Sequence, residues 1–164
     1  MTDGLYFPLL EDGSLLLRTD AASRTQVSHW LPKLPAAARS DDARPTATLT
    51  VALRDGVPDR PSGSPTMMLG PIEAWIAEAG DRVALRSRDG AVTGEVDLAH
   101  PAATIGLSAE AARPVASEVE PRNAAVFSAL TLAAALLLNR MRRALLHAAA
   151  VVAPDGEAWL LVGD

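Results

Sequence analysis

The chain has 164 residues, enough for one domain with a sizeable hydrophobic core. Hydrophobic residues make up 49% and charged residues 21%, which is typical of a globular protein rather than a disordered one. The net charge of −5 argues against a general nucleic-acid binder, and the absence of cysteine excludes disulfides and thiolate sites. The first ten residues lack the features of a signal peptide, so we expect a cytoplasmic protein.

The region before the long helix described below is predicted to be rich in β-strands. Strands are expected at Leu15–Arg18 and at Thr46–Leu53, where residue types alternate in the second segment. Asp89-Gly90 is a strong turn signal between Arg82–Arg88 and Ala91–Leu98, and one face of this pair is clearly more polar. These two segments are therefore predicted to form a β-hairpin.

Two proline-rich or aperiodic segments are predicted to be loops, with one short helix after them. Pro35–Pro45 shows no periodicity, and Asp55–Pro71 contains so many prolines and glycines that we expect no regular element there. Ile72–Ala79 is predicted as a short helix that packs Trp75 and Ile76 inward and ends at Gly80.

The strongest predicted element is a helix of roughly 25 residues that begins at Pro121, where a proline is well tolerated in the first turn. The apolar run Ala124–Leu138 is shorter than the roughly 20 residues of a membrane span, so we interpret it as a core helix. Its apolar stripe is predicted to comprise Phe127, Leu130, Ala134, Leu137, Met141 and Leu145.

Two apolar strands are predicted near the C-terminus. His147–Ala153 and Glu157–Val162 flank the turn Pro154–Gly156, and the second strand runs directly into Gly163 and Asp164. A buried strand that ends in glycine is how a phosphate-binding loop of the pattern GxxxxGK[ST] begins. Gly163 would be the first glycine of such a loop, whose lysine and Ser/Thr are absent.

The run Arg142–Asp164 resembles the entry to the catalytic domain of HPr kinase/phosphorylases and of HPr-kinase-related proteins. In that family a helix ends in a Leu-His pair, two strands follow around a Gly-containing turn, and the second strand runs into Gly-Asp-Ser-Gly-x-Gly-Lys-Ser/Thr. The matching residues are Leu146-His147, Asp155-Gly156 and Leu161–Asp164, although the turn is a residue or so longer here. The match covers about 23 of 164 residues, and the preceding region resembles no N-terminal domain of the HPr enzymes.

This resemblance implies a catalytic role for His147 beside the transferred phosphate and nucleotide contacts for Gly163 and Asp164. ATP and Mg²⁺ would be cofactors of a full-length parent. None is expected for this chain alone, because its phosphate-binding loop is incomplete and phosphoryl transfer needs all of its parts together. No metal site is expected, since the spacing of His29, His100 and His147 does not suggest one.

We therefore expect a mixed α/β (α+β) fold with two regions. Residues 1–120 would form a β-rich substrate or regulatory region packed on the long helix, and residues 121–164 that helix plus the first strand pair of a P-loop kinase domain. The expected parent is an ATP-dependent serine kinase of the HPr-kinase-related group, such as accompanies peptide-modification systems. It would act on a small protein or peptide and contact neither nucleic acid nor membrane. A non-catalytic peptide- or partner-binding module is the alternative, and self-association is left open.

Overall fold

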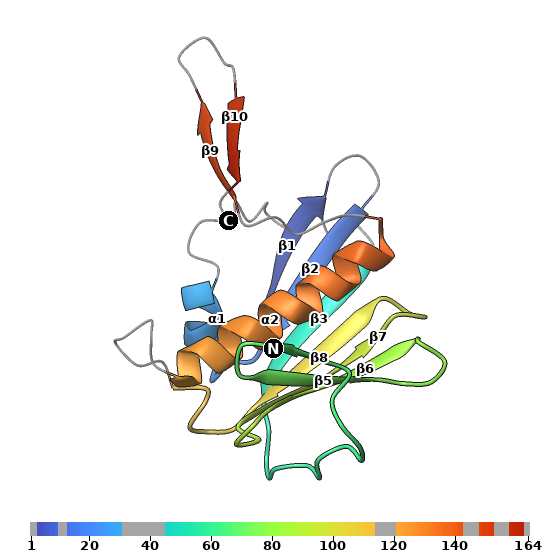
Figure 1. Ribbon diagram of the computed structural model, residues 1–164. Helices are drawn as coiled ribbons and strands as arrows, with labels where there is room; N and C mark the ends of the chain where they lie inside the picture. Colours follow the sequence, from blue (N-terminus) through green and yellow to red (C-terminus); the bar gives the residue numbers. More distant parts are fainter. Residues whose placement is uncertain are drawn as a thin grey trace.

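A computed structural model describes residues 3–9, 13–30, 45–113, 121–142, 148–152 and 158–162. These residues form a mixed sheet with a long helix lying across one of its faces (Figure 1). The expected mixed α/β class is thus confirmed.

Among the described residues, eight strands form the main sheet in the order β1-β2-β3-β8-β7-β6-β5-β4. β2 pairs with β3 and β3 with β8 in parallel, and all other neighbours in this sheet are antiparallel. The strands are β1 (Asp3–Leu9), β2 (Gly13–Thr19), β3 (Ala47–Leu53), β4 (Met67–Leu69), β5 (Ile72–Ile76), β6 (Arg82–Ser87), β7 (Val92–Asp97) and β8 (Ala102–Leu107).

Several strand predictions are confirmed. The segments predicted from alternation and apolar content became β2 and β3, and the hairpin predicted around Asp89-Gly90 is the antiparallel pair of β6 and β7. Gly90 has a φ of 74°, the left-handed conformation that this turn requires. Local turn chemistry and alternation were sufficient for these elements.

The predicted short helix at Ile72–Ala79 is wrong, because Ile72–Ile76 forms β5 between β4 and β6. Pairing on both edges overrides the weak helical pattern of so short a segment. The expectation of no regular element in Asp55–Pro71 is also wrong at its end. Met67–Leu69 forms β4 and turns into β5 through Gly70, which has a φ of 55°.

Three described elements had no counterpart in the sequence analysis: β1, β8 and the helix α1 (Arg24–Trp30). In β8 the side chains of Ala103, Ile105 and Leu107 are buried in alternation with more exposed small residues. Its content of alanine and glycine hid this pattern. His29 belongs to α1.

The helix α2 (Pro121–Arg140) starts at the predicted residue and is shorter than predicted. Arg142, just past its end, has a φ of 57°, a conformation in which a helix cannot continue. Leu130, Ala134 and Leu137 of the predicted stripe are buried, but Phe127 is 52% exposed and its assignment to the buried stripe is wrong. The buried face is instead extended by Val126, Ala129 and Ala133.

The core lies between α2 and the sheet. It joins apolar residues of the helix to alternate residues of the strands, such as Leu49, Val83, Val96 and Ile105. By length and composition alone, the segment from Arg122 to Arg140 is the one described helix that could cross a membrane, and half of it is buried in the fold.

The strands β9 (Ala148–Val152) and β10 (Ala158–Val162) pair with each other in antiparallel fashion and form a second, two-stranded sheet. Figure 1 shows this pair apart from the main sheet. Both predicted C-terminal strands are confirmed, with slightly shorter bounds.

Candidate functional site: a groove on the open sheet face

The residues predicted from the resemblance, His147, Gly163 and Asp164, lie outside the described residues. Their roles in phosphoryl transfer and nucleotide binding therefore stay predictions. Most of the loop predicted at Pro35–Pro45 also lies outside the described residues.

The main sheet presents two chemically different faces because alternate side chains of a strand point to opposite sides. In β6, Val83 and Leu85 join the core beneath α2, whereas Arg82, Ala84 and Arg86 belong to the opposite face. The register extends this opposite face across neighbouring strands. It includes Glu73 and Trp75 of β5, Thr93 and Glu95 of β7, and Thr104 and Gly106 of β8. We call it the open face.

A groove of about 550 Å³ crosses the open face over β5, β6, β7 and β8. Most of its lining surface is apolar, and three arginines reach it. Its volume falls within the roughly 300–1,000 Å³ that is usual for ligand pockets. The side chains that define this sheet-face groove are Arg54, Pro58, Asp59, Pro61, Trp75, Ala84, Arg82, Arg86, Thr93, Glu95 and Thr104.

The segment of residues 54–66 forms one wall of the groove and is fastened to the sheet by side chains. Arg86 Nη1 donates to the Pro58 carbonyl at 2.9 Å, and Trp75 Nε1 donates to the Gly63 carbonyl at 3.2 Å. Arg60 forms an ion pair with the buried Glu73 at 2.8 Å. The Arg60 guanidinium carbon also lies 5.6 Å from the Trp75 ring centroid, within cation–π range. The wall is thus held in place by charge, hydrogen bonds and stacking.

Three arginines give the groove a positive charge in an otherwise acidic protein. Arg82 lies 3.5 Å from Glu95, but both side chains are mostly exposed, so this pair contributes little. Arg54 Nη1 donates to Thr93 Oγ1 at 2.5 Å and its Nη2 donates to the Gly56 carbonyl at 3.0 Å. These contacts fix the guanidinium of Arg54 at the groove beside β7.

The electrostatics of Arg54 reflect this position. Burial, and then repulsion from the nearby Arg86, lower the pKa of Arg54 below its ordinary value. An arginine nevertheless remains charged at any physiological pH. Two like charges are therefore kept close together at the groove.

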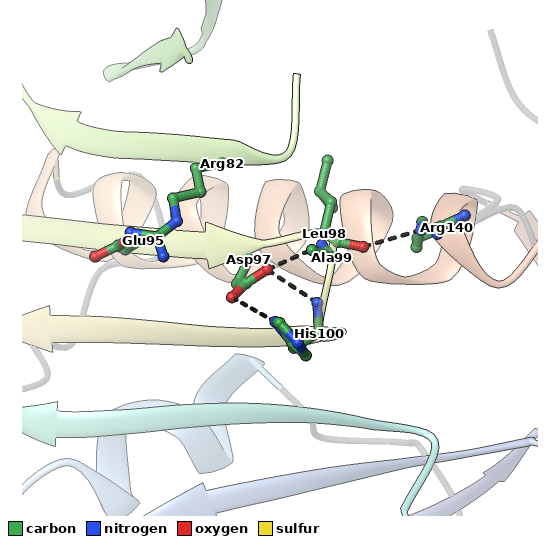
Figure 2. Close-up of polar contacts among 7 residues, drawn as sticks. All are labelled: Arg82, Glu95, Asp97, Leu98, Ala99, His100 and Arg140. Atoms are coloured by element: carbon green, nitrogen blue, oxygen red, sulfur yellow. Dashed lines mark hydrogen bonds and ion pairs between the residues drawn. The ribbon is translucent and has the colours of Figure 1, made fainter. Parts of the chain in front are cut away.

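A polar cluster lies at the end of β7 beside Arg82 and Glu95 (Figure 2). Asp97 Oδ1 accepts hydrogen bonds from the backbone N–H groups of Ala99 and His100, both at 2.9 Å. The bond from the His100 backbone is the main cause that lowers the pKa of Asp97, and it outweighs the effect of desolvation. The His100 ring is 3.4 Å from Asp97 Oδ2 and is largely exposed. We interpret the cluster as a turn-forming one.

The end of α2 is fastened at the same turn. Arg140 Nε donates to the Leu98 carbonyl at 2.9 Å, as Figure 2 shows. The contact joins the last turn of the helix to the connection between β7 and β8. It gives Arg140 a structural role at the end of the helix.

The described residues contain no group of three or more His, Cys, Asp or Glu side chains that could hold a metal ion. The features of a binding surface that the groove does show are its mostly apolar lining and its three arginines. Sequence reasoning missed it because residues 58–61 were assigned to a loop and Arg54 was assigned to no element. The signal available was the polar alternation of Arg82 and Arg86 along β6.

Comparison with known proteins returns no match: no family model, no curated protein and no solved structure is similar to this chain.

Proposed function

We propose that this chain is a polypeptide-binding module that holds an extended segment of a partner protein in the sheet-face groove. The observation that carries the proposal is the groove itself, which crosses four strands beside a wall tied down by Arg60, Trp75 and Arg86. A pre-formed, mostly apolar lining with a few placed polar groups is the usual character of a binding site. A fixed wall also reduces the ordering cost of binding.

The resemblance of Arg142–Asp164 to HPr-kinase-related proteins supports the same role from the sequence side. In a phosphotransferase related to the HPr kinases, this module would present the acceptor protein or peptide, and ATP with Mg²⁺ would bind to the P-loop domain. His147 would contact the transferred phosphate, with Gly163 and Asp164 at the nucleotide. The supporting observations are the run Arg142–Asp164 and the antiparallel pairing of β9 with β10 within it.

Selection from a displayed library of random 12-residue peptides tests the binding role. The purified chain is expected to enrich peptides that share a pattern. Thr104→Trp should abolish their binding, because Thr104 is exposed and lines the groove, so that the larger side chain would occupy the space for the peptide. Tryptophan is also well tolerated in a strand, so the fold should be kept. Ala102→Trp is the matched control, since Ala102 is exposed two residues away on the same face and does not line the groove. Equal binding by wild type and Thr104→Trp would refute the groove as the site.

The kinase relationship has a separate test. Reading the coding sequence around Asp164 should reveal a continuation Ser-Gly-x-Gly-Lys-Ser/Thr, and the extended protein should bind ATP with Mg²⁺ where the 164-residue chain does not. A stop codon after Asp164 would contradict a kinase parent and leave the binding module as the function.

A further inference from the structure

We infer that Arg54 and Arg86 form a carboxylate-binding subsite in the sheet-face groove, so that the module selects acidic segments of its partner. This inference rests on the proposed function and adds the chemical class of the bound segment. Two observations carry it. Hydrogen bonds fix both guanidinium groups at the groove, and neither group forms a salt bridge with a carboxylate of the described residues.

Both arginines are fixed by bonds that leave most of their donors available. A guanidinium carries five N–H donors. Among contacts between described residues, Arg86 uses one of them on the Pro58 carbonyl, and Arg54 uses two, on Thr93 Oγ1 and the Gly56 carbonyl. Arg54 is bonded to Thr93, the register partner of Arg86, and the remaining donors of the two planar groups match the paired oxygens of a carboxylate.

Neither arginine forms a salt bridge with a carboxylate of the described residues. The nearby acids are otherwise engaged or solvated. Glu95 lies against Arg82, and Asp59 is exposed. The Asp89 carboxylate accepts hydrogen bonds from the Ser87 hydroxyl and the Ala91 N–H, and it interacts with Arg86 only through longer-range electrostatics. Two close positive charges without a salt-bridge partner would be stabilised by an anion placed between them.

Two glycines make room for these arginines. A Cβ at Gly106 would lie 3.1 Å from Arg54 Cδ and 3.4 Å from Thr93 Oγ1, so the absent side chain lets Arg54 lie flat on β8. A Cβ at Gly90 would lie 2.6 Å from Arg86 Nη2. Each arginine therefore rests against a backbone position that has no side chain. This packing holds the two guanidinium groups at the groove rather than free in solvent.

The bound group is assigned as a carboxylate of a peptide because the rest of the groove suits a polypeptide. Proline, tryptophan and alanine side chains line it next to the arginines, which suits a segment that alternates acidic with small or apolar residues. Extended chains present alternate side chains to one surface at a spacing of about 6.5 Å. Neighbouring acidic side chains on one face of such a segment could therefore reach neighbouring arginines.

The test uses three fluorescein-labelled ten-residue peptides, (Thr-Glu)₅, (Thr-Gln)₅ and (Thr-Lys)₅, titrated against the whole chain. Wild type is expected to bind the Glu peptide about tenfold more tightly than the Gln peptide, because charge-assisted bonds exceed neutral ones. Arg54→Gln/Arg86→Gln should remove that preference while binding of the Gln peptide persists. Arg88→Gln is the matched control, since Arg88 is an exposed arginine two residues from Arg86 that does not line the groove.

The outcomes separate this inference from the function on which it rests. If wild type binds the Glu and Gln peptides equally and Thr104→Trp abolishes both, the groove binds peptides and the carboxylate subsite is refuted. If no peptide binds, or Thr104→Trp has no effect, both proposals are overturned. An equal loss in Arg88→Gln would attribute the preference to general charge and refute the subsite.

Two further measurements serve as controls. Arg86→Lys keeps the charge but lacks the planar guanidinium, so it is expected to lose part of the preference for the Glu peptide over the Gln peptide. Because this substitution is conservative, it tests the subsite even if the double variant fails to fold. Inorganic phosphate is titrated separately. Free glutamate is titrated as the reference competitor for the Glu peptide. If phosphate displaces the Glu peptide at a concentration equal to or below that of free glutamate, the subsite binds phosphate and the carboxylate assignment is overturned.

Discussion

Replacing Asp20 with alanine is expected to destabilise the fold by about 2 kcal/mol. Asp20 follows β2 and bonds to two separate segments through its carboxylate. Oδ1 accepts from the Ser23 N–H at 2.7 Å and fixes the turn into α1, and Oδ2 accepts from the Leu53 N–H at 2.6 Å at the end of β3. A helix cap contributes about 1 kcal/mol, and a bond to a charged acceptor roughly 1.5–3 kcal/mol. Since one of these bonds is exposed, we take a value near the lower end of the sum.

The effect of this substitution should depend on pH. Desolvation raises the pKa of Asp20, but hydrogen bonds from Leu53, Ser23 and Ala22 together outweigh it and leave the pKa below its ordinary value. A group whose pKa is lower in the folded state stabilises the fold above its unfolded pKa, which is about 3.9 for aspartate. That contribution is lost as the pH falls through the folded pKa. The difference between wild type and Asp20→Ala should therefore be complete at pH 7 and shrink below about pH 4.

Urea denaturation at pH 7 and at pH 3 measures both quantities. A loss of 2 kcal/mol corresponds to a midpoint lower by about 1 M urea at the m-values usual for small proteins. Asp55→Ala is the control, because Asp55 is an exposed aspartate just after the end of β3. Equal midpoints for wild type and Asp20→Ala at pH 7 would refute the double anchor. A difference that stayed the same at pH 3 would refute its electrostatic origin.

The remaining predictions concern the helix and the two close-packed glycines. Leu130→Ala should lower the free energy of unfolding by about 3 kcal/mol, because Leu130 is fully buried. Phe127→Ala should lower it by less than about 1 kcal/mol, because Phe127 is 52% exposed. Thermal unfolding of both variants measures these losses, and similar losses would contradict the exposed position of Phe127. Gly106→Val should displace Arg54 and weaken (Thr-Glu)₅ binding about fivefold, with unchanged binding as the contrary result. Gly90→Ala should cost about 1–2 kcal/mol in urea denaturation because its φ is 74°, and a neutral or stabilising change would refute that strain.

Elements set by local chemistry could be predicted from the sequence. The Asp89-Gly90 turn defines the β6–β7 hairpin, since tight hairpin turns need a positive φ, which Gly90 adopts and most residues disfavour. Pro121 marked the first residue of α2, and the apolar run behind it indicated a core helix. The C-terminal strand pair followed from two apolar runs around a turn. The roles predicted for His147, Gly163 and Asp164 remain predictions, because those residues lie outside the described part of the chain.

Elements set by distant partners could not be predicted in this way. Ile72–Ile76 became a strand because β4 and β6 pair with both of its edges, and the parallel neighbours of β3 come from segments far away in the chain. The exposure of Phe127 was decided by which face of α2 packs on the sheet, since Val126 and Leu130 lie in the core instead. The groove likewise depends on residues 54–66, which fold back over the open face, and on Arg54, which bonds to Thr93, the register partner of Arg86. The sequence by itself thus determined the turns, the long helix and the strand-forming segments. Tertiary pairing alone decided which face stayed open and which charges came together there, because those contacts join residues that no local pattern connects.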